Sequence, residues 1–212
     1  MTSGQQEVVK WVALGTMLVD HVGAVLLSGD AQVLARMVGR LAFPLFAFLL
    51  AYNITVRGVP VARYVGPLAV FSLVSLGPHW AAFGVGSLNI FPTLLVGVLL
   101  IEAGRYGLAW FVGTLAVVLV AGPVLGYGAV GAVLVFLIHG ALVVGGWAWL
   151  PVVLAVGLVN AWPVAVVGLL AAGVVLLLER LPVVLARSPA WVFWWFYPAH
   201  LLLLVGLRRA LA

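Results

Sequence analysis

The chain contains no cysteine and very little charge. Only 7% of its 212 residues are charged, and five of these are acidic. Without cysteine there is no disulfide, no thiolate metal ligand and no cysteine nucleophile. With 66% hydrophobic residues and a mean hydropathy of +1.31, no soluble domain of this length would cover its surface with water-facing groups. The composition therefore predicts a polytopic helical membrane protein.

The basic residues are few and scattered, so we expect no nucleic-acid partner. Ten of them give a net charge of +5, and in a membrane protein such residues mark the cytoplasmic loops. With a cytoplasmic N-terminus, one side of the membrane collects Lys10, Arg57, Arg63, Arg105, Arg180 and Arg187. Arg208 and Arg209 disagree with this orientation. The sequence contains no phosphate-binding loop, no zinc-protease motif and no nucleophile elbow.

The length of the chain limits the number of membrane spans. At about 20 residues per span it allows roughly eight to ten. We predict an all-α bundle of about nine spans in one domain over residues 1–212, with short loops, no soluble domain and membrane lipid around it. The predicted spans are residues 8–27, 33–54, 64–83, 89–103, 106–121, 125–139, 141–158, 163–178 and 191–207.

Residues 37–50 form an apolar stretch with an arginine near its start and a proline in its middle. An arginine in hydrocarbon is costly, so Arg40 should face the protein interior and have a partner. Pro44 should free a backbone carbonyl and bend the helix. The nearest acidic residue, Asp20, lies in the preceding span beside His21. We therefore predict one buried polar site from Asp20, His21 and Arg40.

Polar residues from four predicted spans reach similar depths. At 1.5 Å per residue, Asp20 lies about 18 Å into its span, Arg40 about 12 Å and His200 about 14 Å. Asn89 opens its span at the outer rim. This convergence predicts a site in the outer half of the membrane.

Each of these residues has an alternative role. His21 suits a general base or a proton carrier, and Asp20 would anchor Arg40 or orient a histidine. His200 is a second candidate base, with Tyr197 three residues earlier as its hydrogen-bond partner. Arg40 would clamp an oxyanion or only pair with Asp20. Alternatively, the acidic and basic groups lock two helices together, and His200 is a core histidine bound to a carbonyl.

Other polar residues receive simpler interpretations. Arg36 lies close enough to the outer interface to extend its charge into it, which gives it a structural role. His79 and His139 are interpreted as interfacial residues. A metal site from Asp20, His21 and His200 lacks supporting spacing, so no metal is expected.

Five segments resemble the TraX family of membrane proteins, in family order and over nearly the whole chain. Residues 9–23 read VKWVALGTMLVDHVG, and residues 39–48 read GRLAFPLFAF. Shorter matches are LNIF at 88–91, GYG at 126–128 and FYPAHL at 196–201. The DH and GR-x-AFPLF blocks are the specific ones.

The resemblance implies an integral membrane acyltransferase of the bacterial cytoplasmic (inner) membrane. Acetyl-CoA would be the donor, and the N-terminal amine of a pilin-type protein would be the acceptor, as in conjugation. The family motif positions fall on Asp20, His21, Gly39, Arg40, Phe43, Pro44, Asn89, Tyr127, Tyr197 and His200. Among these, Asn89, Tyr127 and Tyr197 are expected to help to bind the donor.

Acetyl transfer needs chemistry that these residues offer. A base must remove the acceptor proton, and His21 or His200 can serve. A positive group must face the developing oxyanion, and Arg40 is the candidate. Arg57 and Arg63 at the cytoplasmic mouth would hold the CoA phosphates.

Two other functions remain open from the sequence. One is an O-acetyltransferase that modifies a sugar or lipid hydroxyl. The other is a non-enzymatic transporter that uses the same Asp, His and Arg cluster. An inverted repeat would favour the transporter, and the sequence has none that we detect.

Overall fold

The computed structural model describes residues 1–160, 165–182 and 185–211, and within these ranges the fold is all-helical without strands. The α-helices are α1 (Ser3–Leu26), α2 (Gly29–Gly39), α3 (Ala42–Thr55), α4 (Ala62–Val74), α5 (Leu76–Phe83), α6 (Ile90–Tyr106), α7 (Leu108–Ala121), α8 (Gly128–Val144), α9 (Trp149–Asn160), α10 (Ala165–Arg180) and α11 (Ala190–Leu211). Two short 3-10 turns, η1 (Gly122–Val124) and η2 (Gly146–Ala148), precede α8 and α9. The all-α prediction is confirmed.

Three helical segments are long and apolar enough to cross a membrane. They are Ser3–Leu26, Gly29–Thr55 and Ala190–Leu211, and a fourth forms if α4 and α5 count as one span bent by 47°. Shorter apolar helices cover Leu108–Val124, Gly128–Val144 and Gly146–Asn160. These helices make the chain a membrane protein, but the prediction of about nine spans is not confirmed.

Several predicted spans have different boundaries in the structure. The predicted span 33–54 is two helices, because α2 ends at Gly39 and α3 starts at Ala42. The predicted break at residue 140 is wrong, since α8 continues to Val144 and ends at Gly145, whose positive φ of 73° suits glycine. The start of the predicted span 163–178 lies outside the described residues.

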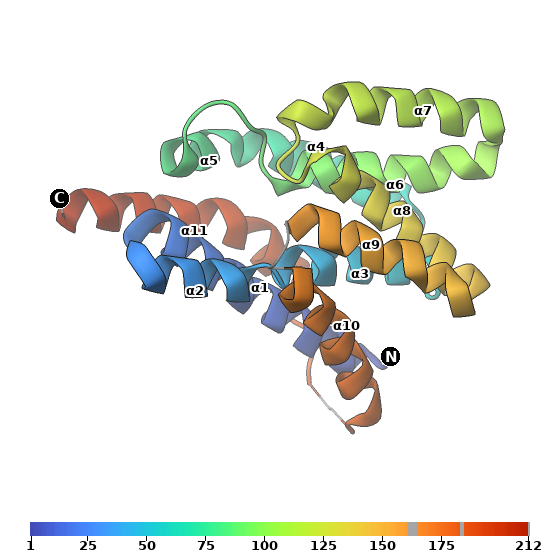
Figure 1. Cartoon of the computed structure of the whole chain (residues 1–212), viewed down its shortest axis with the longest axis horizontal. Coiled ribbons are helices and arrows are strands. Elements are labelled where there is room, and N and C mark those ends of the chain that lie inside the picture. Colours follow the sequence, from blue (N-terminus) through green and yellow to red (C-terminus); the bar gives the residue numbers. More distant parts are fainter. Residues whose placement is uncertain (161–164, 183–184, 212) are drawn as a thin grey trace.

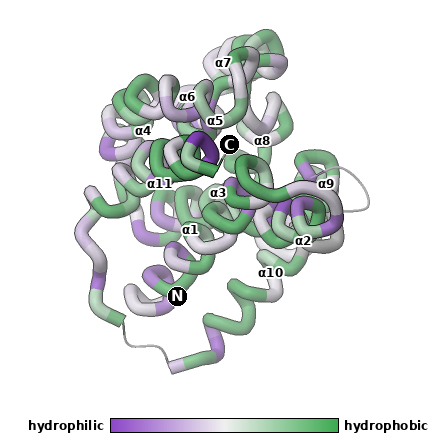
Figure 2. The backbone as a smooth tube through the Cα atoms, turned by 90° about the vertical axis from the view of Figure 1, so that its left-hand side faces the viewer, coloured by the Kyte–Doolittle hydropathy of each residue, from purple (hydrophilic) through white to green (hydrophobic). Residues whose placement is uncertain are grey.

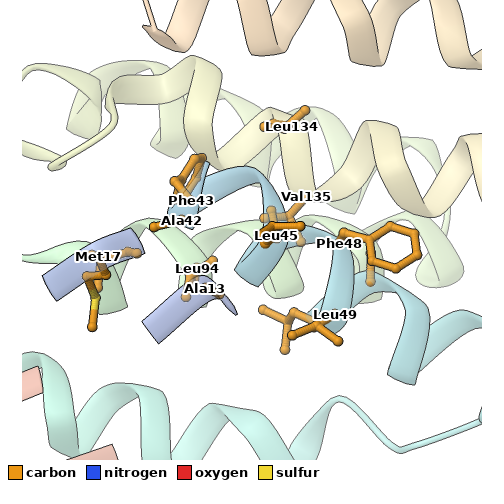
Figure 3. Close-up of a cluster of buried hydrophobic side chains, with 14 of the residues drawn as sticks. Ala13, Met17, Ala42, Phe43, Leu45, Phe48, Leu49, Leu94, Leu134 and Val135 are labelled. Atoms are coloured by element: carbon orange, nitrogen blue, oxygen red, sulfur yellow. The ribbon is translucent and has the colours of Figure 1, made fainter. Parts of the chain in front are cut away.

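The helices run mostly along the long axis of the molecule, with the two termini at opposite ends (Figure 1). Hydrophobic residues dominate the tube in Figure 2, and hydrophilic ones are confined to short stretches. Helix α3 lies in the middle and packs against α1 and α8. Figure 3 shows this core, where Phe43 and Leu45 of α3 approach Leu134 and Val135 of α8.

Small residues let these helices come close. A Cβ at Gly97 of α6 would lie 2.7 Å from the Cβ of Val135 in α8. Glycine therefore sets the distance between α6 and α8, as is common where membrane helices pack. This contact fixes α8 and the residues that precede it, which include a tyrosine of the site described below.

The end of the bundle near the N-terminus is closed by hydrogen bonds, which we call the N-terminal network. Glu7 is fully buried and accepts from Lys10 Nζ and from the Ser188 amide, both at 3.1 Å. The Met1 amine donates to the Tyr52 hydroxyl at 2.7 Å. Gln5 donates to the backbone carbonyls of Glu179 and Leu181. These bonds tie α1 to α3, to the last turn of α10 and to residues that follow α10.

Candidate functional site

A polar cavity of about 160 Å³ lies at the other end of α1. Helices α1, α2, α5 and α11 gather around this end, at the left of Figure 1. The lining residues are Met17, Asp20, His21, Arg36, Arg40, Ala42, His79, Phe83, Ser87, Leu88, Ile90, Gly126, Tyr127 and Tyr197. The cavity therefore combines a carboxylate, two arginines, two histidines and two tyrosines from separate parts of the chain.

Asp20 is held by the close contact of α1 with α2. Its side chain packs on Gly39, where a Cβ would lie only 2.1 Å from the Asp20 Cβ. The carboxylate Oδ2 then accepts from Arg36 at 3.3 Å. The sequence suggested Arg40 as this partner. The structure corrects that point, because the hairpin of α1 and α2 brings Arg36 over Asp20, while the Arg36 side chain stays 35% exposed.

His21 and His200 are hydrogen-bonded to each other. His21 Nδ1 lies 2.6 Å from His200 Nε2, and the two rings are parallel to within 3° with centroids 5.0 Å apart. His200 Nδ1 lies 2.6 Å from the carbonyl oxygen of Phe196, one helical turn earlier. Since a carbonyl only accepts, His200 Nδ1 carries the proton and its Nε2 accepts. His21 Nδ1 must then be the donor between the rings.

This arrangement leaves His21 Nε2 as a proton acceptor at the cavity. Among the described residues it has no hydrogen-bond partner, and His21 lines the cavity. His200 is buried behind it and is not itself a lining residue. His200 therefore orients His21 and fixes its tautomer, an arrangement typical of a base and its orienting group. Tyr197, the predicted partner of His200, bonds a different residue.

Arg40 and Tyr127 form another wall. Arg40 follows the last residue of α2, and its guanidinium lies near the Tyr127 hydroxyl. The ring of Tyr127 stacks on that of Phe43, with centroids 4.0 Å apart. Gly131 makes room for this pair, because a Cβ there would lie 2.5 Å from the Tyr127 Cβ. Phe43 thus holds Tyr127 at the cavity.

His79 belongs to the site, which the sequence reasoning missed. It is buried and lines the cavity. Its Nδ1 lies 3.1 Å from the Tyr197 hydroxyl and its Nε2 3.4 Å from Ser87 Oγ. The signal available in the sequence was Pro78, which breaks a long apolar stretch next to a histidine. His139, the other histidine predicted at an interface, lies 2.6 Å from Thr55 Oγ1 and away from the cavity.

Three predicted donor-binding residues are not lining residues. Asn89 is fully buried, where it accepts from the Phe91 amide at 3.0 Å and donates to the Ser72 carbonyl at 2.8 Å. It caps α6 and so holds the segment beside the cavity. Arg57 and Arg63 are exposed after α3, and Arg57 donates to Gln6 Oε1 at 2.9 Å. Their role in holding CoA phosphates stays a prediction.

A second hollow, the apolar groove, has a volume of about 480 Å³. It lies between α3, α8, α9 and α10 and is lined by Pro44, Leu45, Phe48, Tyr52, Ile138, Leu142, Trp149, Val152, Val153, Val156, Ala171, Ala172, Val175, Leu176 and Glu179. Its polar lining residues, Tyr52 and Glu179, lie next to the N-terminal network. Pro44 at the other end is next in sequence to Phe43, whose ring stacks on Tyr127 of the polar cavity.

The described part of the chain has no group of three or more His, Asp or Glu side chains placed to hold an ion. The histidines bond each other, a carbonyl and hydroxyl groups instead. The arrangement is suited to proton transfer beside a fixed positive charge.

The fold and the cavity define an all-helical membrane protein with a polar site at one end of its bundle. Residues 5–208 match the family model described as TraX protein. The chain belongs to the TraX family, which confirms the resemblance of its motifs. None of the curated proteins and none of the solved structures matches it.

Proposed function

We propose that this chain is a membrane acetyltransferase with acetyl-CoA as its donor. The acceptor is the N-terminal amine of a pilin-type protein, on the outer side of the bacterial cytoplasmic membrane. The chain's N-terminus is cytoplasmic in this proposal. Because α1 runs from the N-terminus toward the polar cavity, the cavity then faces the outer side, where the acceptor would arrive.

The observation that carries the proposal is the pair of hydrogen-bonded histidines. His21 Nδ1 is held by His200 at 2.6 Å, and its Nε2 is left for a proton from a substrate. In acetyl transfer the acceptor nitrogen attacks the thioester carbon and loses a proton, and His21 Nε2 takes it. His200 accepts the hydrogen bond from the resulting imidazolium and so stabilises it.

Arg40 provides the positive charge that the reaction needs. When the amine adds to the thioester, the carbonyl oxygen becomes an oxyanion. A guanidinium fixed beside the cavity stabilises that charge more than it stabilises the neutral carbonyl. Tyr127, which lies near Arg40 and is stacked on Phe43, keeps this wall rigid.

The cavity is large enough for the reacting groups but too small for the rest of the donor. A volume of about 160 Å³ suits an acetyl group and the end of an acceptor, not a whole CoA molecule. The nucleotide part of CoA therefore stays at the cytoplasmic end, where Arg57 and Arg63 are exposed. Helix α3 lies between Arg40 and these arginines and has 14 residues, which makes it about 21 Å long at 1.5 Å per residue. The pantetheine arm bridges a distance of that order.

Binding of the donor is the first test. We expect purified protein in detergent to bind acetyl-CoA in the micromolar range, and free CoA to compete better than dephospho-CoA because one phosphate contact is missing. Arg57→Ala or Arg63→Ala should weaken binding about tenfold, the loss of one charged contact. The matched control is Arg105→Ala, because exposed Arg105 already pairs with Glu102 at 3.1 Å.

Absence of binding at millimolar acetyl-CoA would contradict the donor and return the transporter to consideration. Equal weakening by Arg105→Ala would contradict the assigned phosphate site but not the donor. Acetylation of a synthetic pilin N-terminal peptide, followed by mass spectrometry, tests the acceptor separately.

The apolar groove supports a second acceptor, a membrane lipid with a free hydroxyl. The groove offers room for a hydrocarbon chain, and its lining residue Pro44 is next in sequence to Phe43, which stacks on Tyr127 of the polar cavity. His21 would then remove the proton of a hydroxyl instead of an amine. Labelled acetyl groups recovered in extracted lipid, and not in the peptide, would select this acceptor.

A further inference from the structure

We propose that His79 is a second catalytic residue, the general acid that protonates the leaving sulfur of the donor. The inference rests on the proposed acetyl transfer. His79 lines the same cavity as His21, and both rings contact Phe83, with centroid distances of 5.0 Å and 5.2 Å. The two cavity histidines thus pack against one aromatic ring, and each is hydrogen-bonded to another side chain.

The bend between α4 and α5 brings His79 to this position. The two helices meet at Ser75 at an angle of 47°, and α5 packs against α11. Pro78 lies in the first turn of α5, where a missing amide proton costs no helical hydrogen bond. A straight span would carry His79 past the cavity, so the bend serves the site.

The hydrogen bonds of His79 suit a protonated ring. Its Nδ1 lies 3.1 Å from the Tyr197 hydroxyl, whose oxygen can accept a proton donated from Nδ1. In this proposal His79 enters the reaction as an imidazolium, so its Nε2 also carries a proton. Its contact with Ser87 Oγ is long, at 3.4 Å, and is easily exchanged for a substrate atom.

The protons of the reaction balance between His21 and His79. The acceptor nitrogen forms a bond to the acetyl carbon, and His21 Nε2 takes the proton that the nitrogen loses. The carbon–sulfur bond breaks, and the sulfur takes the proton of His79 Nε2. His79 enters this step as an imidazolium, leaves it as a neutral imidazole, and later regains a proton from His21. The products are the acetylated acceptor and the free thiol.

Transfer rates measured with different leaving groups distinguish a general acid from a structural histidine. The test uses acetyl-CoA, its selenoester analogue and its oxygen-ester analogue, which share all binding groups of CoA. A selenolate is a weaker base than a thiolate, and an alkoxide is a much stronger one. Loss of a general acid therefore matters least for the selenoester and most for the oxygen ester.

We expect His79→Gln to lower kcat for the thioester about 100-fold, more for the oxygen ester and only a few-fold for the selenoester. Near-normal selenoester turnover also shows that the variant is folded. His21→Gln should lower the thioester and selenoester rates by similar factors, since its role is at the acceptor. Tyr197→Phe should show the same order of rate losses over the three donors as His79→Gln, with smaller losses. If His79→Gln does not fold, the Tyr197→Phe rates are the test of the general acid.

Equal losses for all three donors in His79→Gln, or in Tyr197→Phe where that variant decides, would overturn the general acid. Transfer by the wild-type protein from none of the donors would overturn the proposed function itself, and with it this inference. If the wild-type protein transfers acetyl groups but the rate loss in His79→Gln is the same for every leaving group, only the general-acid inference is overturned.

Discussion

The two ends of the bundle hold polar side chains in opposite ways. In the N-terminal network, Glu7 is fully buried and bound by Lys10 and the Ser188 amide. At the polar cavity, His21 keeps one nitrogen open while His200 holds the other. A network whose polar groups hydrogen-bond to one another stabilises the fold. A cavity that leaves a hydrogen-bond acceptor without a protein partner is able to bind a substrate. Substitutions at the two ends should therefore affect different measurements.

The largest expected effect on transfer is that of His21→Gln. Removal of a general base lowers turnover by about 100- to 10,000-fold, while the glutamine amide still fits beside His200. The control is His139→Gln, because His139 is also a membrane-helix histidine and bonds Thr55 at 2.6 Å. We expect the control to keep transfer within a few-fold, measured with acetyl-CoA and the peptide acceptor. Equal activity of the two variants would remove His21 from the mechanism.

An intermediate effect is expected for Gly39→Ala. The new Cβ would lie 2.1 Å from the Asp20 Cβ, so α2 must move away from α1 and carry Arg36 and Arg40 with it. Such overpacking costs about 1–3 kcal/mol, and a displacement of catalytic groups by about 1 Å lowers turnover up to about 100-fold. Thermal unfolding in detergent and the transfer assay measure the two losses.

The control for that substitution is Gly15→Ala in the same helix as Asp20. A Cβ at Gly15 meets nothing within 4 Å, so neither stability nor transfer should fall. If Gly39→Ala matched Gly15→Ala in both measurements, the close contact of α1 with α2 would not be what positions the cavity.

Helix composition and the motif blocks indicated most residues that line the cavity. The breaks between helices explain why the partners of these residues were not predicted. Asp20, His21, Arg40, Tyr127 and Tyr197 all line the predicted cavity, with His200 directly behind. These residues were recognisable because charge is costly in an apolar span. Their depth followed from counting residues along a helix.

The partners of these residues could not be predicted in the same way. Arg36 and Arg40 are four residues apart and share a helix face, so only the break after Gly39 decides which one meets Asp20. His79 was not assigned to the site because a straight span was assumed, whereas α4 and α5 are bent by 47° and His79 lines the cavity. Bends depend on the packing of distant helices, which a single sequence does not specify.

The smallest expected effect on transfer is that of Glu7→Gln in the N-terminal network. The neutral amide loses the ion pair with Lys10, 3.1 Å away, and presents a donor where a carboxylate accepted from the Ser188 amide. Loss of hydrogen bonds to a buried charged group costs about 1–3 kcal/mol, so thermal unfolding in detergent should shift to lower temperature. The polar cavity lies at the other end of α1, and transfer below the unfolding temperature should stay within about twofold of wild type, a factor worth less than 1 kcal/mol.

Lys10→Ala is the matched control for Glu7→Gln. It should lower the stability less, because the Lys10 side chain is 28% exposed while that of Glu7 is fully buried. A large loss of transfer in Glu7→Gln at unchanged unfolding temperature would contradict the division between the two ends, since it would link the N-terminal network directly to the chemistry.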